Sequence, residues 1–373
     1  MKNAEASNIT KIIAAVIIGV MLIFMIGIVA NGWQNDLNGE NSGEVDDSND
    51  NADNLNGDTD ENEGTADNIT VEKEPEIPKF MSYLTGLKIT EDMDGILPYA
   101  ILIEPGAPIY GISGSELTIE IPTENGNTRF VVYRNDISNL GKIGAITKTR
   151  NYISQTVKFF GGIQVAYGND DIVSYSSIPS TLHIDLSKNS DYVYKENGKN
   201  IYTDRENLET LVKSEGIDLL SYKNQNMPFE FVEYYETVSG NASAETVLIP
   251  YTDTNSTYLK YDAASKTYHL YKGERAKVDM LDGKTALYKN VFVLFSNMIT
   301  YELSSGTETV VDTASGGSGY YITDGTLTEL RWSVDKNGNL TFKDLNENKL
   351  TVNRGNSYIG YYKASDLSSV IFD

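Results

Sequence analysis

The chain has 373 residues, of which 40% are hydrophobic, and this length predicts about two domains. It contains no cysteine, which excludes disulfides, thiolate metal sites, a cysteine nucleophile and a lipid-modified N-terminal cysteine. The net charge of −23 argues against nucleic-acid binding, because an acidic chain repels the phosphate backbone.

Residues 12–31 are predicted to form one transmembrane helix, because all but the last are apolar or glycine. Nineteen such residues rise about 28 Å as a helix, close to the thickness of the hydrocarbon core of a bilayer. Lys2 and Lys11 precede this helix, and no Lys or Arg follows it before Lys73. The positive-inside rule therefore places residues 1–11 in the cytoplasm and the remainder outside, in a single-pass plasma-membrane protein. The alternative is a cleaved signal peptide, but the apolar run is longer than a typical signal sequence has.

Residues 32–79 are predicted to be a disordered acidic linker. Residues 34–72 hold 13 Asp or Glu and no Lys or Arg, with Asn, Gly, Ser and Thr filling most of the rest. Such a segment buries too little apolar surface to offset the entropy of ordering. Of the net charge of −23, residues 34–72 contribute −13 and residues 1–33 contribute +1, which leaves −11 for residues 73–373. We expect a solvated tether; the alternative is a segment that binds cations or a basic partner.

Residues 80–238 are predicted to form an α/β or α+β domain, since strand and helix patterns mix there. Residues 148–160 show apolar positions at helical spacing. Thr203 followed by Glu206 has the spacing of a capping box, and Gly216 suits the C-terminus of the helix that would follow. Strands are expected at residues 99–104, 116–121, 129–133 and 163–167, the second and third forming a hairpin.

Residues 244–373 are predicted to form an antiparallel all-β domain, a sandwich or a barrel-like fold. The helical pattern stops there, and short strand patterns recur between Asp-Gly and Asn-Gly turn signals. Residues 290–296 are the most apolar of these strands, so we expect them to be central. The strands are expected at residues 246–251, 258–261, 267–271, 290–296, 309–312, 320–323, 330–334, 340–343, 349–352 and 358–362.

No motif identifies a reaction, so the catalytic residues are unknown and we expect neither a cofactor nor a metal. The glycine-rich segment Ala314–Gly319 lacks the lysine and the following helix of a phosphate-binding loop. We therefore interpret it as a hairpin or bulge loop. His183 and His269 each lie within a predicted strand, and neither has a second ligand at metal-binding spacing.

Basic residues in apolar surroundings are the best candidates for ligand binding, because Arg captures carboxylate or phosphate groups through two parallel hydrogen bonds. The alternative is that each forms an internal salt bridge with one of the many acidic residues. The candidate ligand-binding residues, all in the first predicted domain, are Arg129, Lys148, Arg150, Asn200, Tyr202 and Arg205.

Short segments between residues 82 and 362 carry a family resemblance through their order and spacing. They are Leu84–Leu87, Asn127–Tyr133, Lys142–Gly144, Lys199–Thr203, Ile249–Tyr251, Tyr261–Tyr268, Lys289–Phe295, Gly317–Gly325 and Trp332. Together they resemble the YerB-type family of bacterial cell-envelope lipoproteins, a family of unknown function. The resemblance implies an N-terminal α/β domain, a C-terminal β domain and an outward-facing position on a Gram-positive-type membrane. It implies no established activity.

The chain departs from this family in three places. Family members commonly carry a lipobox cysteine, which is absent here, so residues 12–31 would supply the anchor instead. The family's Gly-Pro-Val-Arg-Ser-Ala-Arg run appears as Gly144–Arg150, with Thr147 in place of one arginine and Lys148 beside it. The two family histidines are also replaced. Any catalysis that depends on them elsewhere in the family would be missing from this chain.

We expect a non-catalytic, membrane-anchored extracellular protein that binds a cell-envelope partner, either a protein or an anionic wall polymer. The alternative is an envelope enzyme that acts on a phosphorylated or glycosidic substrate; a spacer or scaffold is a third possibility. Internal ion pairing of both Arg129 and Arg150 would argue against the enzyme. Its pocket would be lined by Arg129, Lys148, Arg150 and Asn200, with Asp170 or Asp171 as the base.

Overall fold

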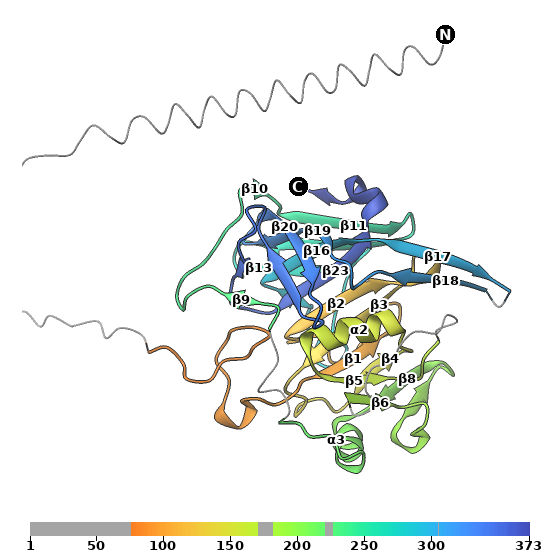
Figure 1. Cartoon of the computed structure of the whole chain (residues 1–373). Coiled ribbons are helices and arrows are strands. Elements are labelled where there is room, and N and C mark those ends of the chain that lie inside the picture. The colour runs from red at the N-terminus through yellow and green to blue at the C-terminus, as the bar shows by residue number, and fades with distance from the viewer. Residues whose placement is uncertain (1–75, 171–181, 221–226, 305) are drawn as a thin grey trace, which may run out of the picture. The chain divides into compact units, whose positions relative to one another are not determined.

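A computed structural model of the chain describes residues 76–170, 182–220, 227–304 and 306–373, and Figure 1 shows their arrangement. The predicted transmembrane helix and all but the last four residues of the predicted linker lie outside these ranges. Among the described residues, no helix has the length and apolar character needed to cross a membrane. Contacts place all described residues in one compact unit, residues 73–373.

The described residues are mostly strand, with few helices. The first part contains η1 (Glu91–Met93), β1 (Tyr99–Ile103), β2 (Leu117–Pro122), η2 (Glu124–Gly126), β3 (Thr128–Arg134), β4 (Ile143–Ile146), α2 (Asn151–Phe160), β5 (Ile163–Ala166), β6 (His183–Asp185), η4 (Ser190–Tyr192), β7 (Tyr194–Glu196), β8 (Asn200–Thr203), α3 (Arg205–Ser214) and β9 (Glu230–Phe231). The predicted hairpin of β2 and β3 is confirmed, because the two strands pair antiparallel.

The second part contains strands and one short 3-10 segment. Its elements are β10 (Ala242–Ser243), β11 (Thr246–Thr252), β12 (Asn255–Asp262), β13 (Thr267–Lys272), β14 (Arg275–Ala276), β15 (Leu287–Tyr288), β16 (Asn290–Ser296), β17 (Met298–Leu303), β18 (Gly306–Val311), β19 (Gly317–Thr323), β20 (Thr326–Val334), β21 (Leu340–Lys343), β22 (Thr351–Val352), β23 (Ser357–Lys363), η5 (Ala364–Ser369) and β24 (Ile371–Phe372). β17 and β18 form a two-stranded ribbon that extends away from the larger sheets (Figure 1).

One sheet runs through both parts of the chain, in the order β10-β20-β19-β16-β23-β2-β3-β1-β4-β8-β7. The parts meet where β23 pairs with β2, in parallel, over Leu117–Glu120 and Ser357–Gly360. β23 also pairs in parallel with β16. The prediction of a purely antiparallel second part is therefore wrong at this strand. A parallel pair requires a long connection, and residues 297–356, which hold β17 to β22, provide it.

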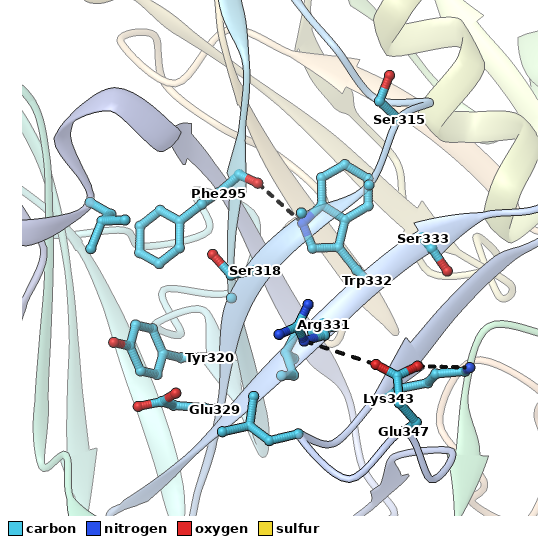
Figure 2. A pocket seen from close by; sticks show the side chains of 16 residues that line it. Phe295, Ser315, Ser318, Tyr320, Glu329, Arg331, Trp332, Ser333, Lys343 and Glu347 are labelled. Carbon is cyan, nitrogen blue, oxygen red and sulfur yellow. Dashed lines mark hydrogen bonds and ion pairs between the residues drawn. The ribbon is translucent and has the colours of Figure 1, made fainter. Parts of the chain in front are cut away.

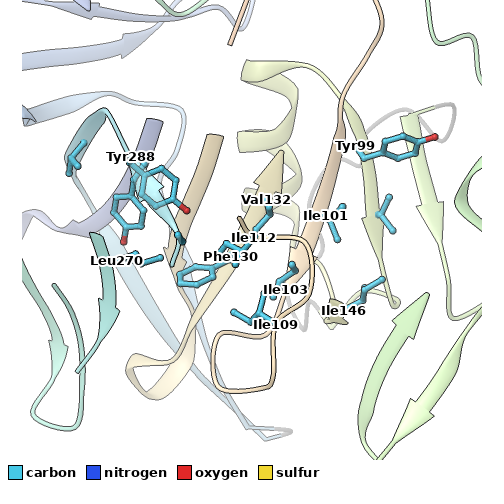
Figure 3. Packing of buried hydrophobic residues seen from close by; sticks show 14 of the residues in the cluster. Tyr99, Ile101, Ile103, Ile109, Ile112, Phe130, Val132, Ile146, Leu270 and Tyr288 are labelled. Carbon is cyan, nitrogen blue, oxygen red and sulfur yellow. The ribbon is translucent and has the colours of Figure 1, made fainter. Parts of the chain in front are cut away.

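A continuous apolar core joins the two parts. It contains Ile101 and Ile103 of β1 and Phe130 of β3, together with Leu270 of β13 and Tyr288 of β15 (Figure 3). The second sheet, ordered β14-β13-β12-β11-β24, contributes to this cluster along with the large sheet. Since the core crosses the sequence boundary at residues 238–244, the two parts share buried surface, and each depends on the other for burial.

α2 and α3 each have ten residues, and both start later than predicted. α2 begins at Asn151 because Thr149 pairs with Asn169 as a β-bridge and Arg150 has extended backbone angles. For α3 the capping residue is Asp204, whose carboxylate accepts a 2.9 Å hydrogen bond from the Asn207 amide. The prediction of a Thr203 cap is wrong, because that hydroxyl donates to the Tyr192 carbonyl. The left-handed residue at Gly216 is confirmed, with φ of +64°.

The cap gives a direct test of this helix start. Replacing Asp204 with alanine removes the acceptor for the Asn207 amide and should lower the free energy of unfolding by about 1 kcal/mol. Urea unfolding followed by tryptophan fluorescence would measure the loss, since Trp332 is buried. Thr203→Ser keeps a hydroxyl and serves as the control. An Asp204 variant as stable as the parent chain would show that the cap contributes nothing.

Candidate functional site

Two of the predicted arginines converge on one carboxylate. Arg129 of β3 is 8% exposed and donates to both oxygens of Asp170, at 3.0 and 2.8 Å. Arg150, at the residue before α2, donates from Nε to the same carboxylate at 2.7 Å. Burial alone raises the pKa of Asp170, but the hydrogen bonds and charges of the two arginines outweigh it, so the pKa lies below its usual value. Asp170 therefore occupies the place that an anionic ligand would take.

Arg150 also contacts two other acidic residues. Its guanidinium is 2.9 Å from the Glu124 carboxylate and 3.3 Å from Glu308, which lies on β18 and is completely buried. Arg150 thus links the β17–β18 ribbon to the first part of the chain. Arg129 and Arg150 therefore both form internal ion pairs, which is the alternative to ligand binding. An enzyme that uses these two groups to bind a substrate, with Asp170 as its base, is disfavoured.

The other predicted residues do not join this cluster. Arg205, in the first turn of α3, pairs with Glu209 at 2.9 Å. Tyr202 of β8 is buried, and its ring lies 4.1 Å from the Lys142 ammonium. Lys148 is exposed on the segment before α2. Asn200 lines a separate depression of about 560 Å³ with Glu104, Thr147 and Lys199, and Asp171 lies outside the described residues.

The shared carboxylate makes stability dependent on pH. Because the Asp170 pKa is lower in the folded chain than in the unfolded one, its stabilisation is complete above the ordinary aspartate pKa of about 3.9. It is lost as the pH falls through the lower folded value. The difference in unfolding free energy between the parent chain and Asp170→Asn should shrink as urea titrations move from pH 7 to pH 3. A difference that stays constant over this range would contradict the assignment.

A groove of about 650 Å³ lies on the second part of the chain (Figure 2). Its floor is the outward face of β19 and β20, where residues alternate between buried and exposed. Ser318 pairs in register with Arg331, and Tyr320 with Glu329. All four residues line the groove, and so does Trp332, the residue after Arg331, which is buried and donates from its indole nitrogen to the Phe295 carbonyl.

The walls of the groove come from two more segments. Leu367 of η5 is 46% exposed, and Leu345, in the turn after β21, is 54% exposed. This turn is fixed by Asp344, whose carboxylate accepts from the Asn346 and Asn348 amides at 2.8 and 2.9 Å. The groove therefore combines apolar walls with a charged floor, on backbone that is held by strands and by a hydrogen-bonded turn.

A glycine-rich segment that the sequence predicts to be a loop lies at one edge of the groove. The prediction of a hairpin or bulge loop over Ala314–Gly319 is wrong at its end, because Gly317–Gly319 belong to β19, and β18 before the segment pairs with β17 rather than with β19. Ser315–Gly319 line the groove. The available signal was the alternation Glu329, Arg331, Ser333 on one face of a strand. That pattern is ordinary for a solvated strand face, and only the walls turn it into a groove.

Within the described residues, neither histidine lies in a group that could hold a metal ion. His183 begins β6, and burial lowers its pKa. His269 lies on β13 with Nε2 3.8 Å from the Asp262 carboxylate. Across the described ranges, no group of three or more His, Asp or Glu is positioned to hold a metal ion.

Comparison with known proteins places the chain beside one family. Residues 84–218 match the N-terminal domain, and residues 247–359 the C-terminal domain, of a family described as "Protein of unknown function (DUF3048)". The crystal structure of the YerB protein from Bacillus subtilis is similar with a TM-score of 0.65 and 20% identity, over 79% of this chain and 100% of that one. At this identity the likeness shows the fold alone. No curated protein matches the chain.

Proposed function

We propose that this chain, which belongs to the DUF3048 family of two-domain, YerB-like proteins of unknown function, is a membrane-anchored extracellular protein that binds a cell-envelope partner without catalysis. The observation that carries the proposal is the open groove on β19 and β20, with exposed leucines on its walls and charged groups on its floor. Exposed apolar side chains gathered on one surface are typical of sites that bind another molecule.

The anchor part of the proposal rests on sequence. Residues 12–31 would span the plasma membrane, with residues 1–11 in the cytoplasm and residues 32–79 as a tether to the extracellular domains. In this proposal an N-terminal α/β domain, residues 80–238, and a β-rich domain, residues 244–373, follow the tether.

The absence of cysteine makes this topology testable in living cells, because any introduced cysteine is unique. A membrane-impermeant maleimide should label Lys213→Cys on intact cells, since Lys213 is exposed on α3. It should label Ser7→Cys only after permeabilisation. Labelling of Ser7→Cys on intact cells, or of neither variant, would contradict the topology.

A protein partner fits the groove better than an anionic wall polymer. The Lys343 ammonium is already 3.2 Å from the Glu347 carboxylate, which also lies 4.0 Å from Arg331. The groove therefore has no cluster of unpaired cations to hold a polyanion, and residues 73–373 carry a net charge of −11, which repels one. The two leucines offer apolar contact that a polypeptide side chain can use.

Photo-cross-linking in cells tests the groove as a binding surface. A photoreactive amino acid at Ser333, which lines the groove, should give a discrete cross-linked product. The same group at Lys213 on α3 is the matched exposed control and should give none. Leu345→Asp should reduce the product from Ser333 severalfold by placing a charge on the wall. A protease-sensitive product identifies a protein; a product that resists protease but is removed by wall-polymer hydrolysis identifies the polymer instead.

A further inference from the structure

The floor of the groove presents two charges of opposite sign on one strand. Glu329 and Arg331 are two residues apart on β20, so both side chains leave the same face. Two residues of extended chain span about 7 Å. A partner chain that lies extended along β20 repeats this spacing, so that its own side chains two residues apart can meet both charges.

Both charges remain available for a partner. The Arg331 side chain is 65% exposed, and Glu347, its one ion-pair partner within the described residues, lies 4.0 Å away and is closer to Lys343. Glu329 is exposed and forms no ion pair with the described part of the chain. Its carboxylate lies beside Tyr320 (Figure 2), and burial together with this negative charge raises the pKa of the tyrosine hydroxyl.

The apolar walls of the groove favour a partner that carries an apolar side chain. Leu345 and Leu367 both line the groove with about half of their surface exposed, and neither belongs to the buried apolar clusters of the described residues. An apolar side chain that packs on either leucine would remove water from it. Tyr320 stands edge-on to Phe295 at 5.8 Å between ring centres, which fixes its ring at the end of the groove near Glu329.

From this arrangement we infer that the groove binds an extended polypeptide segment that carries a basic and an acidic side chain two residues apart, with an apolar residue adjacent. The basic side chain meets Glu329 and the acidic one meets Arg331. This inference rests on the proposed function and specifies the partner's chemistry. Recognition then depends on the order of the charges, whereas a polyanion would respond only to the cations.

Selection of random peptides on the full chain tests the order directly. The probe is a displayed library of random dodecapeptides, and the bait is the full chain in lipid nanodiscs. Selection should enrich peptides in which a basic and an acidic residue are separated by one residue, in the one order that the direction of the bound segment sets. The double variant Glu329→Arg with Arg331→Glu keeps the net charge and should enrich the opposite order. Peptides selected on the parent should bind the double variant about tenfold more weakly.

A matched variant controls for charge exchange as such. Lys213→Glu with Glu215→Lys also exchanges two exposed charges two residues apart, at the end of α3, and should leave peptide binding unchanged. Thermal unfolding of both double variants checks that each is folded. Failure to enrich any pattern, or enrichment of the same pattern on parent and exchanged groove, would overturn the inference. Cross-linking from Ser333 that persists in that case would leave the proposed binding function standing.

Discussion

Replacing Lys272 with methionine is expected to lower the free energy of unfolding by about 3–5 kcal/mol. Its ammonium lies 2.6 Å from the Glu120 carboxylate, which is completely buried. Glu120 also accepts from Thr128, Thr257 and Tyr358, at 2.6, 2.7 and 2.5 Å. Three hydroxyls satisfy the carboxylate as an acceptor but cannot neutralise it, so loss of the lysine leaves an uncompensated buried charge.

This ion pair also connects the two sheets. Glu120 lies on β2 of the large sheet, and Lys272 on β13 of the smaller one. Burial, followed by the Glu120 charge, raises the pKa of Tyr358 well above its ordinary value, which keeps the hydroxyl protonated as a donor. We therefore expect the loss to appear as weaker docking of one sheet on the other, within a single cooperative transition.

Urea unfolding followed by tryptophan fluorescence measures the effect, and a double variant separates its cause. In a Glu120→Gln background the buried charge is gone. The loss of unfolding free energy caused by Lys272→Met should then be less than half of its value in the parent chain. Lys213→Met, at an exposed position on α3, is the control and should change stability by less than about 0.5 kcal/mol. Equal costs of Lys272→Met in both backgrounds would show that the lysine acts through packing rather than through charge.

The elements that local patterns specify were predictable. Strands β1, β3, β13 and β16 fall within about a residue of their expected positions, because apolar runs and alternation are properties of neighbouring residues. The place of β23 was not predictable. Its sequence is that of a buried strand in any orientation, and the choice to insert it in parallel between β16 and β2 depends on contacts with residues more than sixty positions away.

In the candidate site, too, the sequence predicts what neighbouring residues determine but not which distant residues come into contact. The sequence indicates that Arg129 and Arg150, in apolar surroundings, need acidic partners. It does not identify Asp170 and Glu308 as those partners, since both are distant and the chain has 53 acidic residues. The groove is harder still to foresee. It is formed by β19, β20, the turn after β21 and η5, and none of these segments carries a motif by itself.

Replacing Arg150 with methionine should be the most damaging change among the predicted ligand-binding residues. The Arg150 guanidinium contacts Asp170, Glu124 and Glu308, so its loss removes an ion-pair partner from each of these three carboxylates. Removing one partner from a buried ion pair typically costs about 3–5 kcal/mol. Since Glu308 belongs to the β17–β18 ribbon, we also expect the ribbon to become more sensitive to protease than the rest of the chain.

Two variants distinguish this role from a general effect of losing an arginine. Arg205→Met removes a half-buried arginine whose ion pair with the exposed Glu209 is accessible to solvent, and should cost no more than about 1 kcal/mol. Glu308→Gln in the Arg150→Met background removes the most deeply buried of these three charges and should recover part of the stability. Urea unfolding and limited proteolysis of the four chains decide the matter. If Arg150→Met costs no more than Arg205→Met, the cluster does not hold the ribbon, and Arg150 becomes available again as a group that binds an external anion.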